Sequence, residues 1–363
     1  MRASTASSPP GLESTADADT PPADASTIDA PESRTAGPRR LVAIGGGTGL
    51  AVVLRGLKHC LGGRTEALTA VVTVADDGGS SGRLRRELGV LPPGDIRNCI
   101  VALADDEDLM SQLFQYRFPN GGGLSGHSFG NLFLTALTGI TGDFYQAILT
   151  AEEILAVRGR ILPATLSDVR LRGLGRSGRV YEGESAVGRS GEELTDLALD
   201  PPQVAPFPRA VEALENADLV VLGPGSLYTS VLPNLLIPGI RQAIRRSGAP
   251  VVLISNLMTQ PGETDAMSAQ AHFEALRRHT GERLIDQVLI NSTKPPQRLL
   301  DRYADTGSEL VTCDRQALER QDIEVVARDL LAEGDLIRHD PTKLADAVLS
   351  LVHSSTTRTP DAS

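Results

Sequence analysis

The feature that most constrains the fold is a glycine-rich turn between a short apolar run and an amphipathic segment. The apolar run LVAI (residues 41–44) leads into GGGTGL (45–50), and an amphipathic helical pattern follows to residue 61. A second apolar run, residues 70–75, then ends in Asp76-Asp77. This order of strand, glycine turn, helix and strand predicts two parallel strands joined by a right-handed crossover, which is one half of a mononucleotide-binding fold.

The same order recurs further along the chain. We expect strands at 218–222, 250–255, 284–290 and 323–327, helices that begin at Gly94 and near Gly126, and helices at 151–157, 234–246 and 341–352. Short alternating stretches between Thr165 and Val187 predict an excursion from the core. The predicted fold class is therefore α/β: a doubly wound, mostly parallel Rossmann-like sheet with a small β-meander excursion.

The two ends of the chain differ from the middle in composition. Residues 1–38 are rich in Ser, Thr, Pro, Ala and acidic residues, with no aromatic, and residues 354–363 are similar. Such segments bury too little apolar surface to offset the entropy of ordering, so we expect two disordered tails. The first tail is either a plain solvated extension or a target for phosphorylation. Between the tails, residues 39–353 are predicted to form one Rossmann-like domain.

Composition and charge exclude several classes of function. A net charge of -11 and an aromatic content of 3% argue against a nucleic-acid partner, which needs basic and stacking side chains. No apolar run approaches the roughly 20 residues that span a bilayer, so we expect no membrane partner. The N-terminus lacks the apolar segment of a secretory signal, and the three cysteines show no disulfide pattern. These observations predict a cytoplasmic protein.

The first glycine turn is the strongest candidate for a ligand site. It comprises Gly45, Gly46, Gly47, Thr48 and Gly49. Glycines after a strand let backbone N–H groups approach a diphosphate, and the helix that follows adds partial positive charge. The turn does not match G-x-G-x-x-G, because a leucine stands at the third glycine, and no Gly-Lys-Ser/Thr follows. NAD binding and P-loop hydrolysis are disfavoured; the remaining alternative is a tight turn without a ligand.

The second candidate is the acidic turn after the second strand. Asp76 and Asp77 are followed by Gly78-Gly79 and then by Ser80 and Ser81. In doubly wound sheets this place holds an acid that faces a ribose or a metal. The pair is predicted to bind ribose hydroxyls or Mg²⁺, or to form a mobile loop; the alternative is a simple turn cap.

Two helix starts add further candidates. Asp95 has the position of a helix N-cap, and Arg97 and Asn98 in the same first turn are placed to meet a phosphate or carboxylate. His127 precedes another helix start, which contains Asn131. A histidine in that setting is a candidate phosphate donor or general base, although a lone histidine is commonly structural. The histidines show no zinc-ligand spacing, so no metal is predicted as a resident cofactor.

A second glycine turn follows the strand at 218–222. It contains Gly223, Gly225 and Ser226 and, like the first turn, ends a strand that opens a strand–helix–strand unit. Two such turns place ligand contacts along one edge of one sheet. The next strand ends at Asn256, and Thr259 and Gln260 follow closely. Asn256 and its neighbours are predicted to recognise a base or sugar by hydrogen bonds.

Together these segments resemble the bacterial gluconeogenesis factor family, whose fold is similar to that of 2-phospho-L-lactate transferase. The resemblance covers about residues 40–353 and is carried by VADDGGSSGRLR, PPGDIRNC, GPGSLYTS and NLMTQPGET. It implies a cytosolic factor needed for cell shape and peptidoglycan wall synthesis during growth on gluconeogenic carbon sources. It also implies a UDP-sugar ligand of the UDP-N-acetylglucosamine type. Its implied partners are a Ser/Thr protein kinase, which would make the chain a phosphoprotein, and a cell-wall synthesis protein. A homo-oligomer is compatible with the sequence.

Two functional hypotheses remain open at this point. In the favoured one the chain is a non-catalytic sensor: the diphosphate lies on Gly45–Gly49 and Gly225-Ser226, an aspartate at 76 or 77 faces the ribose, and Asn256 meets the base or sugar. In the alternative the chain is a transferase that acts on a nucleotide-diphosphate substrate. Asp76 and Asp77 would then hold Mg²⁺, Arg97 would clamp the moving phosphate and His127 would handle a proton.

Overall fold

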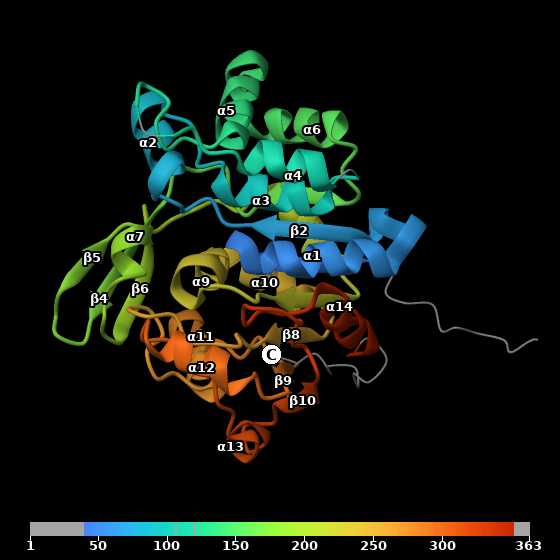
Figure 1. The fold of residues 1–363 in the computed structure, drawn as a ribbon, viewed down its shortest axis with the longest axis vertical. Coiled ribbons are helices and arrows are strands. Elements are labelled where there is room, and N and C mark those ends of the chain that lie inside the picture. The colour runs from blue at the N-terminus through green and yellow to red at the C-terminus, as the bar shows by residue number, and fades with distance from the viewer. Residues whose placement is uncertain (1–39, 106, 120, 352–363) are drawn as a thin grey trace, which may run out of the picture. The chain divides into compact units, whose positions relative to one another are not determined.

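The computed structural model describes residues 40–105, 107–119 and 121–351 (Figure 1). All of them belong to one compact unit, Gly37–Ser363, and the remaining unit is Met1–Ala36. The two predicted tails, 1–38 and 354–363, lie outside the described residues.

The centre of the compact unit is a parallel sheet of seven strands in the order β10-β9-β8-β7-β1-β2-β3. Its strands are β1 (Leu41–Gly45), β2 (Leu68–Val72), β3 (Arg160–Pro163), β7 (Leu219–Leu222), β8 (Val251–Ile254), β9 (Gln287–Asn291) and β10 (Glu324–Arg328). The chain winds outward from β1 to β3 and, after an excursion, outward from β7 to β10, so the strand order reverses between β1 and β7. The predicted doubly wound α/β fold is confirmed.

Helices cover both faces, because the crossovers on the two sides of the reversal run in opposite directions. The longer helices are α1 (Gly47–Leu61), α2 (Gly79–Leu88), α3 (Gly94–Leu103), α4 (Glu107–Gln115), α5 (Phe129–Thr141), α6 (Phe144–Ile154), α8 (Pro208–Glu215), α10 (Pro238–Ser247), α11 (Ala269–Thr280), α12 (Gln297–Ala304) and α14 (Pro341–Ser350). Short elements are η1 (Gly62–Ala67), α7 (Glu184–Val187), α9 (Leu232–Leu235) and α13 (Arg315–Glu319). As predicted, the last helix docks: α14 packs on α1, and a Cβ on Gly56 would lie 1.9 Å from Pro341 O.

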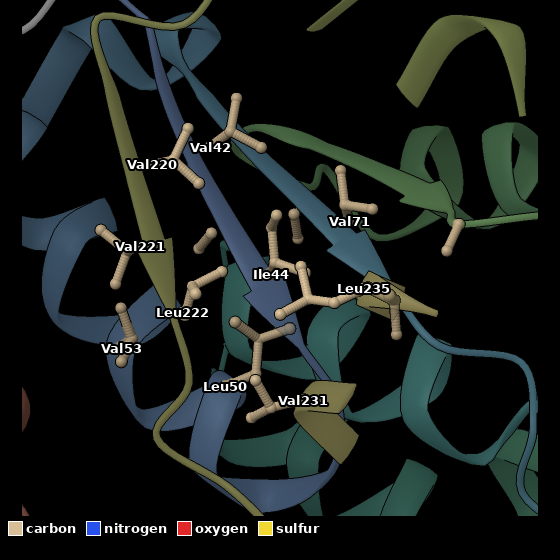
Figure 2. Close-up of a cluster of buried hydrophobic side chains, with 14 of the residues drawn as sticks. Val42, Ile44, Leu50, Val53, Val71, Val220, Val221, Leu222, Val231 and Leu235 are labelled. Atoms are coloured by element: carbon tan, nitrogen blue, oxygen red, sulfur yellow. The ribbon is translucent and has the colours of Figure 1, made fainter. Parts of the chain in front are cut away.

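The apolar core forms around the two strands at the reversal. Figure 2 shows Val42 and Ile44 of β1 beside Val220–Leu222 of β7, with Leu50 and Val53 of α1 packed next to them. These side chains are fully buried, which explains why both strands are continuous apolar runs rather than alternating ones. The core therefore fixes the relative position of the two glycine turns that follow β1 and β7.

The excursion is a three-stranded antiparallel sheet with the order β5-β4-β6. Its strands are β4 (Arg170–Gly175), β5 (Val180–Glu182) and β6 (Leu194–Asp200), so it extends beyond the predicted limit at Val187. β4 alternates exposed and buried residues, as a sheet with one covered face should. The third strand pairs with β4 rather than with β5, because α7 intervenes and carries the chain back across the first strand.

Prolines move one predicted helix boundary. The segment predicted as one helix at 234–246 contains the end of α9 and most of α10, and a π-helical turn, η2 (Leu227–Val231), precedes α9. Pro233 and Pro238 each occupy the first turn of a new helix, where a missing N–H costs nothing. Among the described residues no single helix is long and apolar enough to cross a bilayer; α5 and α6 reach that composition only together, across a bend of 119°.

Candidate functional site

The two predicted glycine turns meet where the strand order reverses. A Cβ on Gly49 would lie 2.2 Å from the carbonyl oxygen of Pro224, so the first turn of α1 packs directly on the second glycine turn. Beside this contact opens a cavity of about 290 Å³, here called the glycine cleft. Its lining residues are Gly46, Gly47, Thr48, Gly49, Val52, Pro224, Gly225, Ser226, Ser230, Asn256, Leu257, Met258, Gln260, Ile337, Arg338 and His339. This is the place where doubly wound sheets bind ligands.

The N-terminus of α1 supplies hydrogen-bond donors to the cleft. The first intrahelical bond of α1 runs from Leu50 N to Gly46 O (3.4 Å), so the N–H groups of Thr48 and Gly49 precede it. Within the described ranges no acceptor meets either N–H group. Gly47, whose φ of 64° suits glycine, turns the chain into the helix. Two unpaired N–H groups at a helix N-terminus form a site suited to an anion.

The second glycine turn is held from behind by side chains that follow β8. The Asn256 amide bonds Gly225 twice: Oδ1 accepts from Gly225 N (3.1 Å), and Nδ2 donates to Gly225 O (2.9 Å). Gln260 Nε2 donates to Ser226 Oγ (2.8 Å). The buried Glu263 carboxylate accepts from Tyr228 N (2.9 Å), and burial raises the pKa of Glu263 to about 7. These bonds stabilise the turn in one conformation.

The far wall of the cleft comes from a segment that sequence analysis missed. Ile337, Arg338 and His339 lie between β10 and α14, and Ile337 belongs to the same small apolar cluster as Leu257. Arg338 is the one arginine or lysine among the lining residues of the described chain. Burial lowers the pKa of His339 to about 4, so its ring is neutral near pH 7. The sequence signal that could have identified this segment is the run Arg338-His339-Asp340 directly before a predicted helix, because Asp340 caps α14.

Asp95 has a different role from the one predicted. Its side chain does not cap α3, because Pro93 occupies the N-cap position without a side-chain hydrogen bond. Instead Asp95 Oδ1 accepts from Gly47 N (2.9 Å), and a Cβ on Gly46 would lie 2.5 Å from Oδ2. The helix-capping prediction is wrong because tertiary contact with the glycine turn outweighed local preference. Burial, together with the nearby Asp76 carboxylate, raises the pKa of Asp95 to about 7.

A second group of predicted residues forms, together with Ser128, a largely buried cluster that we call the Arg97 network: Arg97, Asn98, Ser128, Asn131 and Ser81. Arg97 donates to Ser128 Oγ (2.7 Å), to Asn131 Oδ1 (3.0 Å) and to Asn98 Oδ1 (2.8 Å). Asn131 Nδ2 donates to Ser81 Oγ (3.1 Å), while Ser128 caps α5 by accepting from Asn131 N (3.2 Å). The network thereby ties α2, α3 and α5 together.

His127 lies beside this network but bonds elsewhere. Its Nδ1 is 3.0 Å from Ser80 Oγ, and the ring is buried. Burial, assisted by the Arg83 charge, lowers the pKa of His127. Neither His127 nor Ser80 lines the glycine cleft.

The acidic turn is part of a group of carboxylates. Asp76 Oδ1 accepts from Gly78 N (2.8 Å), and burial raises the pKa of Asp76. Asp77 Oδ1 accepts from Ser185 N (2.9 Å), which attaches the small sheet to the turn. Burial and the charges of Asp76 and Asp77 raise the pKa of Glu184 to about 8. Ionising Glu184 beside these two aspartates costs free energy, so a bound proton or cation would stabilise the group of carboxylates.

The structure divides the predicted site residues into three sets. Gly46, Gly47, Thr48, Gly49, Gly225, Ser226 and Asn256 line the glycine cleft. Asp76, Asp77, Ser80, Ser81, Arg97, Asn98, His127 and Asn131 lie outside its lining, in the Arg97 network and the turns around it. Gly45 ends β1 and accepts from Thr73 N (3.0 Å), while Gly223 donates to Ile44 O (2.9 Å); both shape the turns without lining the cleft.

The predicted carboxylates do not assemble a metal-ligand set. No three Asp, Glu, His or Cys side chains converge as ligands anywhere in the described ranges. One oxygen of the Asp76-Asp77 pair, Asp77 Oδ1, is already engaged by Ser185 N.

Known proteins resemble the chain over most of its length. It matches the family described as 2-phospho-L-lactate transferase CofD over residues 41–331. A protein of Nostoc sp. is 50% identical over 313 residues, which are 85% of this chain and 68% of that protein. The gluconeogenesis factor of Bacillus subtilis is 45% identical over 314 residues, 86% of this chain and 98% of that protein. A crystal structure from Bacillus halodurans is 45% identical, with a TM-score of 0.81 over 85% of this chain and 99% of that one.

Proposed function

The chain belongs to the CofD family and is a relative of the bacterial gluconeogenesis factors, and from that premise we propose that it binds a nucleotide sugar in the glycine cleft. The ligand is a UDP-sugar of the UDP-N-acetylglucosamine type. The protein acts as a cytoplasmic sensor that supports cell shape and wall synthesis during growth on gluconeogenic carbon sources. A Ser/Thr kinase and a wall-synthesis protein are its proposed partners.

The observation that carries the proposal is the pair of unbonded N–H groups of Thr48 and Gly49 in the glycine cleft. They lie at the positive end of α1, and Arg338 lines the same cavity. A diphosphate offers acceptors to both N–H groups and to a guanidinium at once. The cleft also has an apolar part, formed by Val52, Leu257 and Met258, where a pyrimidine ring fits better than a charged group.

Two buried acceptors of the cleft are available to the sugar and the base of the ligand. Gln260 Oε1 and His339 Nε2 are buried, and neither has a hydrogen-bond partner among the described residues. Both are acceptors when His339 is neutral with its proton on Nδ1, so they suit hydroxyl or N–H donors of a ligand. A uracil N–H and sugar hydroxyls supply such donors.

The transferase hypothesis stays as the second candidate because of the family match. It requires the glycine cleft to communicate with the Arg97 network. Asp95 provides a physical link, since it bonds Gly47 N and lies near Asp76. This link transmits a conformational change equally well in a sensor, so turnover must be measured directly.

The test is calorimetric titration of the full chain with UDP-N-acetylglucosamine, UDP, GDP and ADP-glucose, with release of free nucleotide followed in parallel. We expect saturable binding of the UDP compounds without turnover. Arg338→Gln should weaken binding about thirtyfold, because one charge-assisted contact to phosphate contributes on the order of 2 kcal/mol. The exposed Arg320, at the C-terminal end of α13, is the matched control: Arg320→Gln should bind as the wild type does.

Each outcome decides between the hypotheses. Saturable binding that Arg338→Gln leaves unchanged would place the ligand outside the glycine cleft. Nucleotide release that depends on time and enzyme concentration would replace the sensor with the transferase. For the cellular role, a deletion strain grown on a gluconeogenic carbon source should regain normal cell shape with the wild-type gene and not with Arg338→Gln.

A further inference from the structure

A second cavity lies between α2 and the small antiparallel sheet, both of which Figure 1 shows at one side of the central sheet. Its volume is about 270 Å³. The last turn of α2, the acidic turn at Asp77 and the strands β4, β5 and β6 all contribute to its wall. It shares no lining residue with the glycine cleft, so it is a separate site. We call it the arginine cavity.

Arg85 is the buried charge in this cavity, and its side chain is only 6% exposed. Nη2 donates to Val169 O (2.7 Å) and pairs with the Asp168 carboxylate. Nε and Nη1 are buried without a hydrogen-bond partner among the described residues. Since Nε carries one N–H bond and Nη1 two, three donors of this guanidinium lack an acceptor. Buried donors are almost always paired, so an acceptor is expected in the space beside them.

Three more arginines line the cavity: Arg86 of α2 and Arg170 and Arg172 of β4. All three are exposed, and no hydrogen bond or ion pair holds their side chains within the described part of the chain. Arg170 and Arg172 are two residues apart on one strand, so both point to the same face of the small sheet. Four arginines therefore line one cavity.

Three carboxylates also line the arginine cavity, and none of them accepts a hydrogen bond from the unpaired donors of Arg85. Asp77 accepts from Ser185 N (2.9 Å). Glu182 and Asp200 stand opposite Arg172 and Arg170 in the strand register, where they moderate the charge of those exposed arginines. The unpaired donors of the cavity thus belong to arginine, and its carboxylates lie at the exposed edge or are already bonded.

We infer that the arginine cavity binds a phosphate group, as inorganic phosphate or as the phosphate of a small ester, separate from any diphosphate in the glycine cleft. Phosphate offers acceptors in several directions, and guanidinium donors match its geometry. Nε and Nη1 of Arg85 bind the inner oxygens, while Arg170 and Arg172 close over the outer ones. Because Asp77 lines this cavity and also bonds α7 at Ser185, the ligand acts on the contact that attaches the small sheet.

The test uses the full chain with excess UDP present to occupy the glycine cleft. Calorimetric titrations with inorganic phosphate and with glycerol phosphate are compared with acetate at the same ionic strength. We expect saturable binding of one or both phosphates and none of acetate. The double variant Arg170→Ser/Arg172→Ser, at two exposed positions, should bind phosphate at least about tenfold more weakly. Arg320→Ser, at the remote end of α13, should leave phosphate affinity unchanged.

A second variant probes the buried donor. Arg85→Gln should also lose at least about tenfold in phosphate affinity, provided that its circular dichroism matches the wild type; if it does not fold, the double variant decides. Phosphate affinity unchanged in the double variant, or no saturable phosphate binding by the wild type, would overturn the inference. Failure of the nucleotide proposal is a different result, because it appears as absent UDP binding and leaves the comparison of the arginine variants intact.

Discussion

The glycine cleft and the Arg97 network are both built from residues that the sequence singles out, but they differ in how their polar atoms are used. In the cleft, the N–H groups of Thr48 and Gly49 have no acceptor within the described residues. In the network, Arg97, Ser128 and Asn131 bond one another at 2.7–3.2 Å. The cleft has donors left for a ligand, whereas the network uses most of its own to hold three helices together.

This difference predicts that substitutions in the two regions will have different effects. Glycine turns with unbonded N–H groups are incomplete without an anion, so substitutions there should change binding. Side chains that mostly satisfy one another, as in the network, where Arg97 Nε is the buried atom without a partner among the described residues, should change stability first when substituted. Four substitutions, in order of decreasing expected effect, test this division.

The largest effect is expected at Gly49, where the two glycine turns touch. Gly49→Ala places a Cβ 2.2 Å from Pro224 O, so the turns must separate. We expect a loss of about 3 kcal/mol in the free energy of unfolding and no measurable UDP-sugar binding. Gly139→Ala is the matched control: this helical glycine of α5 has nothing within 4 Å of the added Cβ, so stability should hold or rise. Equal stability of the two variants in urea would contradict the packing of the turns.

The next effect concerns the Arg97 network and should fall on stability alone. Arg97→Met removes bonds to Ser128 and Asn131 and leaves Asp76 and Asp95 without their nearest cation. We expect a loss of about 2 kcal/mol in the free energy of unfolding and a UDP-sugar affinity within about threefold of the wild type. Urea unfolding and calorimetry measure the two quantities on one preparation. A stable variant that no longer binds would move Arg97 into the ligand site, as the transferase hypothesis requires.

The sequence predicted the sheet well because strand identity depends on local patterns. Continuous apolar runs that end in glycine turns gave β1 and β7, and the alternation of strands and helices gave the parallel order. Contacts between segments that are far apart in the sequence were harder to predict. Asp95 satisfies every local rule for a helix cap, yet it bonds Gly47, which is 48 residues away.

The candidate site was predicted in part for the same reason. The glycine turns were identified because glycine itself indicates a position where the backbone turns sharply or approaches a ligand. Arg338 and His339 were missed, since they reach the cleft only through the return of the chain after β10, which no local spacing reveals. The predicted role of Asn256 on the base or sugar stays a prediction; in the structure both of its amide atoms bond Gly225.

A pH-dependent effect tests whether Asp95 links the glycine cleft to the Arg97 network. The pKa of Asp95 is about 7 in the folded chain, above its ordinary value, so its contribution to stability is complete in acid and is lost as the pH rises through 7. Asp95→Asn keeps an oxygen for Gly47 N and cannot ionise. Between about pH 5 and about pH 8 the wild type should therefore lose on the order of 2 kcal/mol more than the variant, because each pH unit up to the folded pKa contributes about 1.4 kcal/mol.

Thermal midpoints at both pH values measure this difference. Glu184, whose pKa is raised to about 8, remains in both proteins, so both should lose stability as the pH rises from its ordinary pKa to about 8. Parallel profiles for the wild type and Asp95→Asn would show that Asp95 is already ionised at about pH 5 in the folded state, so that its protonation does not couple the cleft to the network.

The smallest effect is expected at Asp77, and it distinguishes a structural carboxylate from a ligand-binding one. Asp77 Oδ1 accepts from Ser185 N (2.9 Å), and Oδ2 lies so close to Gly183 that a Cβ there would be 2.0 Å away. Asparagine keeps the acceptor for Ser185 N, so Asp77→Asn should change UDP-sugar affinity by less than about threefold. If Asp77 instead faces the ribose, affinity should fall by about tenfold, or roughly 1.4 kcal/mol. Asp305→Asn, at an exposed position after α12, controls for the loss of one charge. Magnesium-dependent turnover by the wild type that disappears in Asp77→Asn would establish the transferase instead, because only a carboxylate engaged in the reaction would lose turnover while ground-state binding persists.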